Sequence, residues 1–109
     1  MIDRAIHALA EPRRRDMLYL VRDGELTSSA IASHFYISAP AVSQHLKVLE
    51  EAGLVVVRRA GTKRFYGIRR EGFAELMQYI ASFWDDSLMR LKAAAEEEER
   101  RKHESNQQQ

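Results

Sequence analysis

The sequence predicts a mainly α-helical fold with one β-hairpin. Apolar residues recur at helical spacing in five segments, capping residues or prolines stand near the starts of most of them, and one β-rich stretch lies at about residues 54–69. The 109 residues suit a single domain, and 45% hydrophobic with 30% charged residues is an ordinary globular composition. We place this domain at residues 1–103 and expect a disordered tail at 104–109.

The first two helices are predicted at residues 3–9 and 12–22. Asp3 is favourable near the positive end of the first helix. Pro12 suits the first turn of the second helix, which Asp23-Gly24 ends. The two helices therefore follow each other after a short break.

A third helix, to about residue 35, has Thr27 or Ser28 as its cap. The fourth helix begins after Ser38 as N-cap and ends at Gly53, a residue that adopts the left-handed conformation easily. Its predicted buried stripe has the spacing i, i+4, i+7 and consists of Val42, Leu46 and Leu49.

The β-rich runs LVVVRR and KRFYGI flank Ala60-Gly61-Thr62 and predict a hairpin with a glycine turn. A long helix is then predicted from about residue 71 to 102, supported by glutamate-to-base pairs four residues apart in AAAEEEERRK. A short helix, a tight turn and a second helix, followed by a basic hairpin, make up a winged helix-turn-helix.

The fourth helix opens with small, uncharged residues where a surface helix usually carries charge. No Asp, Glu, Lys or Arg occurs at residues 26–46. A helix that enters the DNA major groove needs such residues near its N-terminus, because bulky or acidic side chains would hold it away from the bases. Gln44 can pair with adenine, and Ser43 can donate or accept a hydrogen bond. The residues on or beside the outer face are Pro40, Ala41, Ser43, Gln44 and Lys47.

The predicted wing is strongly basic. Residues 57–70 contain six Lys or Arg and no acid. Residues 1–70 carry a net charge of +5 and residues 71–109 one of −4, which suggests an anionic partner for the first part. Taken singly, the helix could be a charge-poor surface helix and the wing a solvated edge hairpin. Together they favour DNA binding, with wing contacts from Arg58, Arg59, Lys63 and Arg64.

The segments ALAEPRRRDMLYLVRDGELT and SAPAVSQHLKVLEEAGLVVVRRAGTKRFYGI resemble the ArsR-type (ArsR/SmtB) bacterial transcriptional repressors over roughly residues 5–92. The resemblance implies that Ser38 caps the recognition helix and that His45 makes a phosphate or packing contact. It also implies a homodimer on an imperfect palindrome near its own promoter, released by an inducer. The base-facing positions that it implies are Ala39, Pro40, Ser43 and Gln44.

The metal-site residues of that family are missing here. Thr27, Ser29 and Ala32 occupy the thiolate positions of one site pattern, and the chain has no cysteine. The other pattern falls on Arg70, Gly72, Phe83 and Asp86, of which only the last can bind zinc. We therefore expect no metal and no cofactor, and an unidentified non-metal signal.

The last helix carries more apolar surface than one small domain usually covers. We expect it to form a homodimer interface, with the first helix packed against the partner. A small apolar inducer between the subunits near Trp84 is an alternative use of the same surface. The predicted interface residues are Phe73, Met77, Ile80, Phe83, Trp84 and Leu88.

Other classes of function are disfavoured by the sequence. The adjacent Asp85 and Asp86 point about 100° apart on a helix, and we find no nucleophile, phosphate-loop or hydrolase motif, so we expect no enzyme. The uncharged residues 26–46 are too polar to cross a bilayer, and the N-terminus does not resemble a signal peptide, so we expect a cytoplasmic protein without a membrane partner. The alternative to DNA binding is a winged-helix module that recruits a protein partner.

Overall fold

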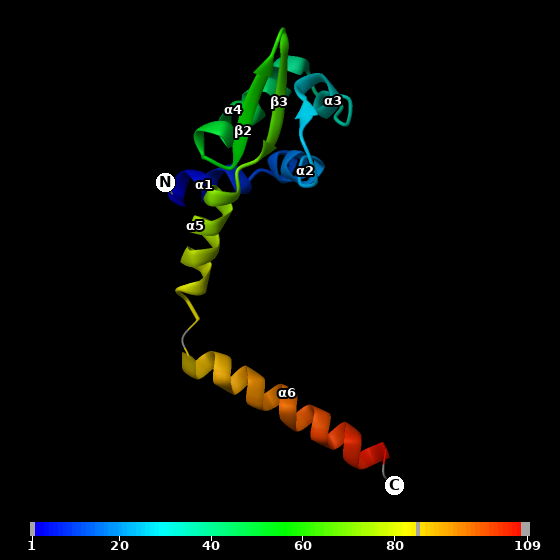
Figure 1. The fold of residues 1–109 in the computed structure, drawn as a ribbon, viewed down its shortest axis with the longest axis vertical. Coiled ribbons are helices and arrows are strands. Elements are labelled where there is room, and N and C mark those ends of the chain that lie inside the picture. Colours follow the sequence, from blue (N-terminus) through cyan, green and yellow to red (C-terminus); the bar gives the residue numbers. More distant parts are fainter. Residues whose placement is uncertain (1, 85, 108–109) are drawn as a thin grey trace. The chain divides into compact units, whose positions relative to one another are not determined.

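The computed structural model describes residues 2–84 and 86–107, without the side chains of residues 86–88, 106 and 107. The chain divides into two units, residues 1–77 and 78–109, where the sequence predicts one domain. Every described side chain from Met77 onward is exposed, and none of them joins the core of the first unit. The helices are α1 (Ile2–Leu9), α2 (Pro12–Leu20), α3 (Ser28–Ala32), α4 (Ala39–Glu51), α5 (Arg70–Ala81) and α6 (Asp86–Gln107) (Figure 1).

The sheet of the first unit has three antiparallel strands in the order β1-β3-β2, namely β1 (Leu26–Thr27), β2 (Val55–Ala60) and β3 (Lys63–Ile68). The β2–β3 hairpin is the predicted wing, and its two-residue loop has Gly61 at φ 61°. Only glycine takes this conformation without strain, as in a type II′ turn. The structure adds the short strand β1, which the sequence does not predict.

The helix ends confirm most of the predicted caps. Pro12 is the first residue of α2, and Thr27, not Ser28, caps α3 by accepting from the amide of Ala30 at 3.1 Å. Gly53, at φ 75°, follows α4 in the left-handed conformation. Since α3 and α4 are joined by a short turn and followed by the wing, the winged helix-turn-helix fold is confirmed.

The core of the first unit is built from α1 to α4 and the hairpin. The predicted stripe of α4 is fully buried, with Val42, Leu46 and Leu49 at most 1% exposed. The first turn of α5 lies directly on the end of α4, since a Cβ at Gly72 would overlap the carbonyl oxygen of Gly53. The other buried core residues are Ala5, Ala8, Met17, Leu18, Val21, Ile31, Ala52, Leu54, Val55 and Tyr66.

The C-terminal helix corrects the predicted elements. Instead of one helix over about 71–102, α5 ends at Ala81 and α6 begins at Asp86. Beyond α5 the amide of Phe83 donates to a carbonyl three residues back at 3.2 Å, and the hydroxyl of Ser82 donates to another at 2.6 Å. This tightening, together with a serine that competes for backbone groups, ends the helix.

The structure also extends α6 into the segment that is predicted to be a disordered tail. Helix α6 continues to Gln107 and so includes residues 104–107, while 108 and 109 lie outside the described residues. Extending an existing helix adds one backbone hydrogen bond per residue, and Glu97 supports α6 through Arg100 at 2.6 Å and Arg101 at 3.8 Å.

Candidate nucleic-acid interface

The N-terminal half of α4 presents a neutral, polar face. The hydroxyl of Ser38 accepts a hydrogen bond from the amide of Ala41 at 3.2 Å, which fixes the start of the helix. Gln44 and, in the next turn, the charged Lys47 lie opposite the buried stripe, Ser43 lies beside this face, and all three side chains are exposed. Ser38, Ala39 and Pro40 are also exposed, whereas Ala41 and His45 are half-buried.

The register of the wing divides its four predicted bases between two faces. Arg59 lies directly opposite Arg64 across the strands, and side-chain alternation places both on the face that also carries the buried Tyr66. Arg58 and Lys63 point to the other face. Two like charges in a direct cross-strand pair repel each other.

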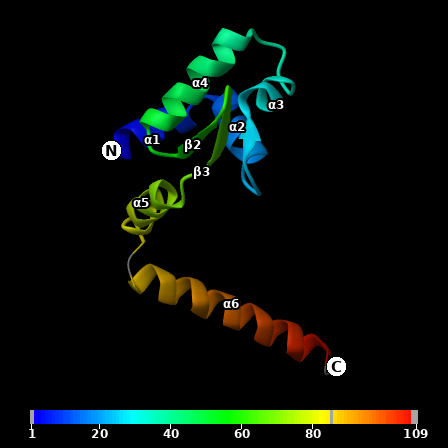
Figure 2. The same cartoon turned by 45° about the horizontal axis from the view of Figure 1, so that its top comes forward.

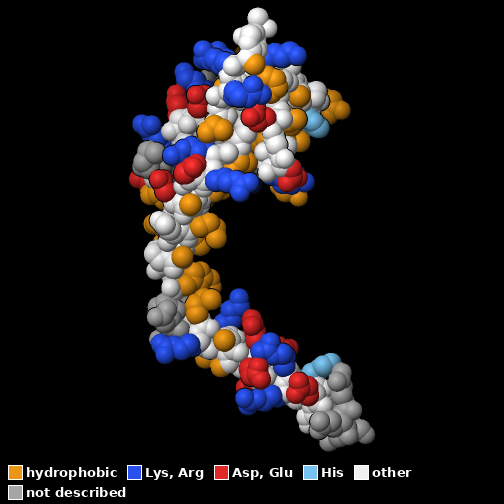
Figure 3. All heavy atoms as spheres, viewed as in Figure 1, with side chains coloured by type: hydrophobic (Ala, Val, Ile, Leu, Met, Phe, Trp, Pro, Cys, Tyr) orange, Lys and Arg blue, Asp and Glu red, His pale blue; other side chains and the backbone are white. Residues whose placement is uncertain are grey.

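One groove joins α4 to the wing, and the views in Figures 1 and 2 agree that these elements lie side by side. Figure 3 shows Lys and Arg side chains on both sides of the wing near its tip. Within the described part of the chain, the side chains of Arg59 and Arg64 have no hydrogen bond or ion pair, so their guanidinium donors are available to an anion. The groove is lined by Pro40, Ser43, Gln44, Lys47, Glu50, Arg59, Arg64 and Tyr66.

Arg58 and Lys63 lie outside this groove. The guanidinium of Arg58 forms an ion pair with Glu25 at 3.0 Å and lies over the ring of Phe65, 4.4 Å from its centroid. Strand β1 explains the pair, because its register beside β3 brings Glu25 to the wing from 33 residues away. A two-residue strand leaves too short a pattern for this contact to be read from the sequence.

His45 contacts Arg14, a residue of the N-terminal helices. Its Nδ1 lies 3.3 Å from Nη1 of Arg14, and the same guanidinium donates to the carbonyls of Ala8 at 2.7 Å and His7 at 3.0 Å. Since arginine only donates, Nδ1 accepts, and the ring proton is assigned to Nε2. Arg14 thus links α1, α2 and α4, a role hidden in the sequence by the run of three arginines at 13–15.

Three further residues of this surface are missed by the sequence. Glu50 brings one acid into the groove, although its place in the last turn of α4 suggests that it lies outside. Tyr66 forms part of the groove wall while it is otherwise buried. Tyr36, in the turn two residues before Ser38, is fully exposed. A large exposed aromatic residue beside a helix N-terminus is a candidate contact residue.

The predicted interface residues of α5 and beyond are mostly exposed. Met77, Ile80, Phe83 and Trp84 are 45–68% exposed, whereas Phe73 is half-buried against the core of its own chain. The side chain of Leu88 lies outside the described residues. Exposed apolar surface of this kind marks protein contacts. Tyr79, Met89 and Leu91 are further exposed large apolar residues.

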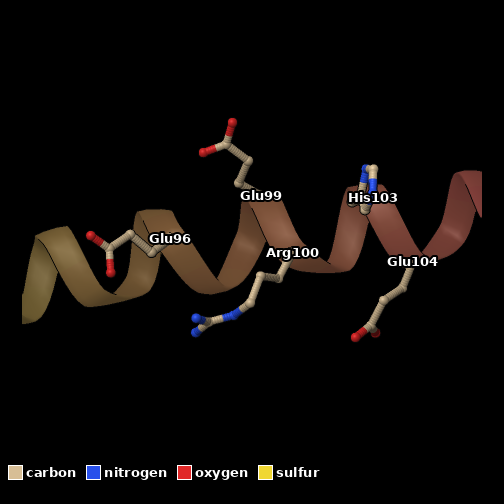
Figure 4. Close-up of a pocket in the computed structure, with 5 residues that line it drawn as sticks. All are labelled: Glu96, Glu99, Arg100, His103 and Glu104. Carbon is tan, nitrogen blue, oxygen red and sulfur yellow. The ribbon is translucent and has the colours of Figure 1, made fainter.

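No group of three or more His, Asp and Glu side chains suited to a metal ion occurs among the described residues. The acidic stretch of α6 shows that many acidic residues close together in the sequence need not form a metal site. Figure 4 shows five side chains of this one helix that point to different sides and enclose no common centre: Glu96, Glu99, Arg100, His103 and Glu104. None of the described helices has the length and apolar character needed to cross a membrane.

Comparison with known proteins shows which family and which solved structures this chain resembles. Residues 11–57 match the family described as "Bacterial regulatory protein, arsR family". The "HTH-type transcriptional regulator Rv2034" of Mycobacterium tuberculosis is 43% identical over 86 residues, covering 79% of this chain and 80% of the relative. The "Transcriptional repressor SdpR" of Bacillus subtilis is 32% identical over 76 residues, covering 70% and 84%. The solved homodimeric winged helix-turn-helix DNA-binding domain Mb0332 of Mycobacterium bovis has 34% identity and a TM-score of 0.62, covering 75% of this chain and 76% of its own.

Proposed function

Because the chain belongs to the ArsR family of bacterial regulatory proteins, we propose that it is a homodimeric, sequence-specific transcriptional repressor. It binds double-stranded DNA at an imperfect palindrome near its own promoter. The observation that carries this proposal is the groove in which the neutral face of α4 meets Arg59 and Arg64, two bases without a described partner.

Base recognition belongs to α4 in this proposal. The start of the helix enters the major groove, where Gln44 pairs with adenine and Ser43 donates to or accepts from a base edge. Pro40 and Ala41 contact thymine methyl groups, and Ser38 and Ala39 lie at the DNA surface. The exposed side chains of Ser43 and Gln44 support this assignment, since neither is used inside the protein.

Phosphate binding belongs to Lys47 and to the wing. Arg59 and Arg64 grip the backbone beside the recognition helix, or one of them enters the minor groove. Arg58 and Lys63 reach a more distant phosphate from the other face of the wing. His45 acts by holding α4 through Arg14, since its Nδ1 is already occupied.

Dimerisation uses the exposed apolar residues around α5. Two recognition helices must be about 34–36 Å apart to reach successive major grooves, so the subunit contact sets the length of the operator. The interface consists of Phe73, Met77, Ile80, Phe83, Trp84 and Leu88, and the exposed Ile6 of α1 supports packing of the first helix against the partner. SdpR is a repressor and Mb0332 a homodimer, which supports both parts of the proposal.

The releasing signal is not a metal ion in this proposal. Thr27, Ser29 and Ala32 offer no thiolate, and Arg70 and Phe83 offer no ligand where the second site of the family would lie. A bacterial repressor that binds DNA acts in the cytoplasm, and it requires no catalytic group. We therefore expect a non-metal signal.

The first experiment is binding of the purified protein to its own upstream DNA, measured by fluorescence anisotropy. Titrations at several salt concentrations, with and without an unrelated duplex as competitor, separate specific from electrostatic binding. We expect tight binding that resists the competitor, with affinity that falls by a log–log slope of about −0.9 for each phosphate contact.

The alternative, a module that recruits a protein partner, predicts no binding and no salt dependence. Equal and weak binding to both duplexes would contradict sequence-specific recognition of that DNA. A binding stoichiometry of one chain per operator would contradict the dimer.

A further inference from the structure

A second pocket lies in the first unit, away from the groove that faces DNA. Residues of α1, α2, β3 and α5 surround it, and it has a volume of about 470 Å³. Small-molecule sites in proteins commonly measure about 300–1,000 Å³ and are mostly apolar. The lining residues are Leu9, Arg15, Leu18, Tyr19, Arg22, Ile68, Arg70 and Phe73.

The pocket combines an apolar floor with a basic rim. Leu18 is buried, and Ile68 and Phe73 are half-buried, while the three arginines of the rim are exposed. No Asp or Glu belongs to the lining. The rim therefore complements an anion, and the floor complements an apolar body attached to it.

The three arginines differ in how much of their hydrogen-bonding capacity is used. Arg15 donates to the carbonyl of Leu9 at 2.6 Å, and Arg22 donates to the carbonyl of Tyr19 at 2.6 Å. Arg22 also lies 3.4 Å from Asp23, in an exposed ion pair that contributes little. The side chain of Arg70 makes no hydrogen bond or ion pair with any described residue, and its planar fork fits a carboxylate in two-point contact.

We propose that this pocket binds a free amphipathic carboxylate, with its aliphatic or aryl body on the apolar floor and its carboxylate on Arg70. Arg15 and Arg22 add positive potential at the rim. Bound in this way, the carboxylate lowers the affinity of the protein for its operator. This last step rests on the proposed DNA-binding function, whereas the binding step does not.

A short chain of contacts connects the pocket to the recognition helix. Arg70 and Phe73 belong to the first turn of α5, and Gly72 between them packs against the carbonyl oxygen of Gly53 at the end of α4. Arg69 strengthens the junction, since its Nη1 donates to the same carbonyl at 3.2 Å and its amide donates to the next one at 2.9 Å. A ligand that shifts this turn therefore shifts the end of α4.

The test uses the full chain and decanoate as the probe, below its micelle concentration. Isothermal titration calorimetry without DNA is expected to give one decanoate per chain and much weaker binding of decan-1-ol. Arg70→Gln should weaken decanoate binding at least about tenfold, the loss of one charge-assisted contact. Arg4→Gln, an exposed arginine of α1 outside the pocket, should leave it unchanged. Circular dichroism verifies that each variant is folded.

Several results would overturn the site. One is equal binding of decanoate and decanol, and another is equal binding by Arg70→Gln and the unmodified protein. Loss of binding in Trp84→Ser, with Arg70→Gln unaffected, would place the ligand on the exposed apolar surface instead. Tyr19→Ser is a second test, because loss of this lining side chain should weaken decanoate binding. If Tyr19→Ser weakens only dimerisation, the pocket belongs to the subunit interface and the proposal is wrong.

The coupling to DNA is tested separately. Saturating decanoate should reduce operator affinity by at least about fivefold, and operator DNA should weaken decanoate binding by the same factor. If decanoate binds but operator affinity is unchanged, the regulatory step is overturned and the site stands. If no operator binding is found at all, the proposed function fails while the calorimetry of the free protein still decides the site.

Discussion

Helices α4 and α5 are nearly equal in length, at 13 and 12 residues, yet they expose opposite kinds of surface. Helix α4 buries its long aliphatic side chains within its own chain and exposes polar ones, namely Ser43, Gln44 and Lys47. Helix α5 buries only Gly72 and Leu76 and exposes large apolar side chains, namely Met77, Tyr79 and Ile80.

The difference indicates that the exposed faces of the two helices favour different kinds of partner. Covering apolar surface gains about 25 cal/mol per Å², so the exposed face of α5 gains stability when another protein surface covers it. The exposed face of α4 gains nothing from apolar cover, because its polar groups would lose their hydrogen bonds to water. A polar partner such as DNA can replace those bonds.

The largest expected effect is on stability, from Leu46→Ala in the buried stripe of α4. Loss of a fully buried leucine side chain should lower the free energy of unfolding by about 2–5 kcal/mol, measured by urea denaturation. Its exposed neighbour provides the control, since Lys47→Ala should weaken DNA binding and change stability by less than about 0.5 kcal/mol. Equal destabilisation by both variants would contradict the assignment of the two faces.

The second effect concerns assembly. Ile80→Glu places a charge in the proposed subunit interface and should weaken dimerisation by at least about 2 kcal/mol, or about 30-fold, in analytical ultracentrifugation. Gln78→Glu adds the same charge to the same helix, about 200° away around its axis, and should have little effect. If both variants remain equally dimeric, Ile80 does not lie at the interface.

The third effect concerns sequence preference. Gln44→Ala should reduce discrimination between the operator and a duplex with one changed adenine by about 1–3 kcal/mol, measured by competition anisotropy. The same substitution at Gln78 on α5 should leave discrimination unchanged. Unaltered preference in Gln44→Ala would show that another residue reads that base.

The smallest effect separates the two faces of the wing. Arg64→Gln should weaken binding to all duplexes alike and reduce the salt slope by about one contact. Arg58→Gln should have a smaller effect, because the positive charge of Arg58 is already paired with Glu25. A larger loss from Arg58→Gln would reverse the assignment of the faces.

The sequence determined the local structure wherever one short segment carries the physical cause. The hydroxyl of Ser38 caps the start of α4, and Gly53 follows the end of the helix in the left-handed conformation. Gly61 adopts the positive φ that the tight loop of the wing requires. The spacing of Val42, Leu46 and Leu49 likewise required a buried stripe, which left Ser43, Gln44 and Lys47 on the outside. The fold and half of the candidate site follow from such local patterns.

Only the tertiary structure decided which of these groups meet. The pairing of Arg58 with Glu25 and the link from Arg14 to His45 join residues more than 30 positions apart in the chain, and one groove brings Glu50 together with Arg59 and Arg64. The carboxylate pocket likewise takes residues from both ends of the first unit. Such contacts depend on strand register and helix packing, which the whole core determines. No single segment of the sequence therefore shows a pattern that predicts them.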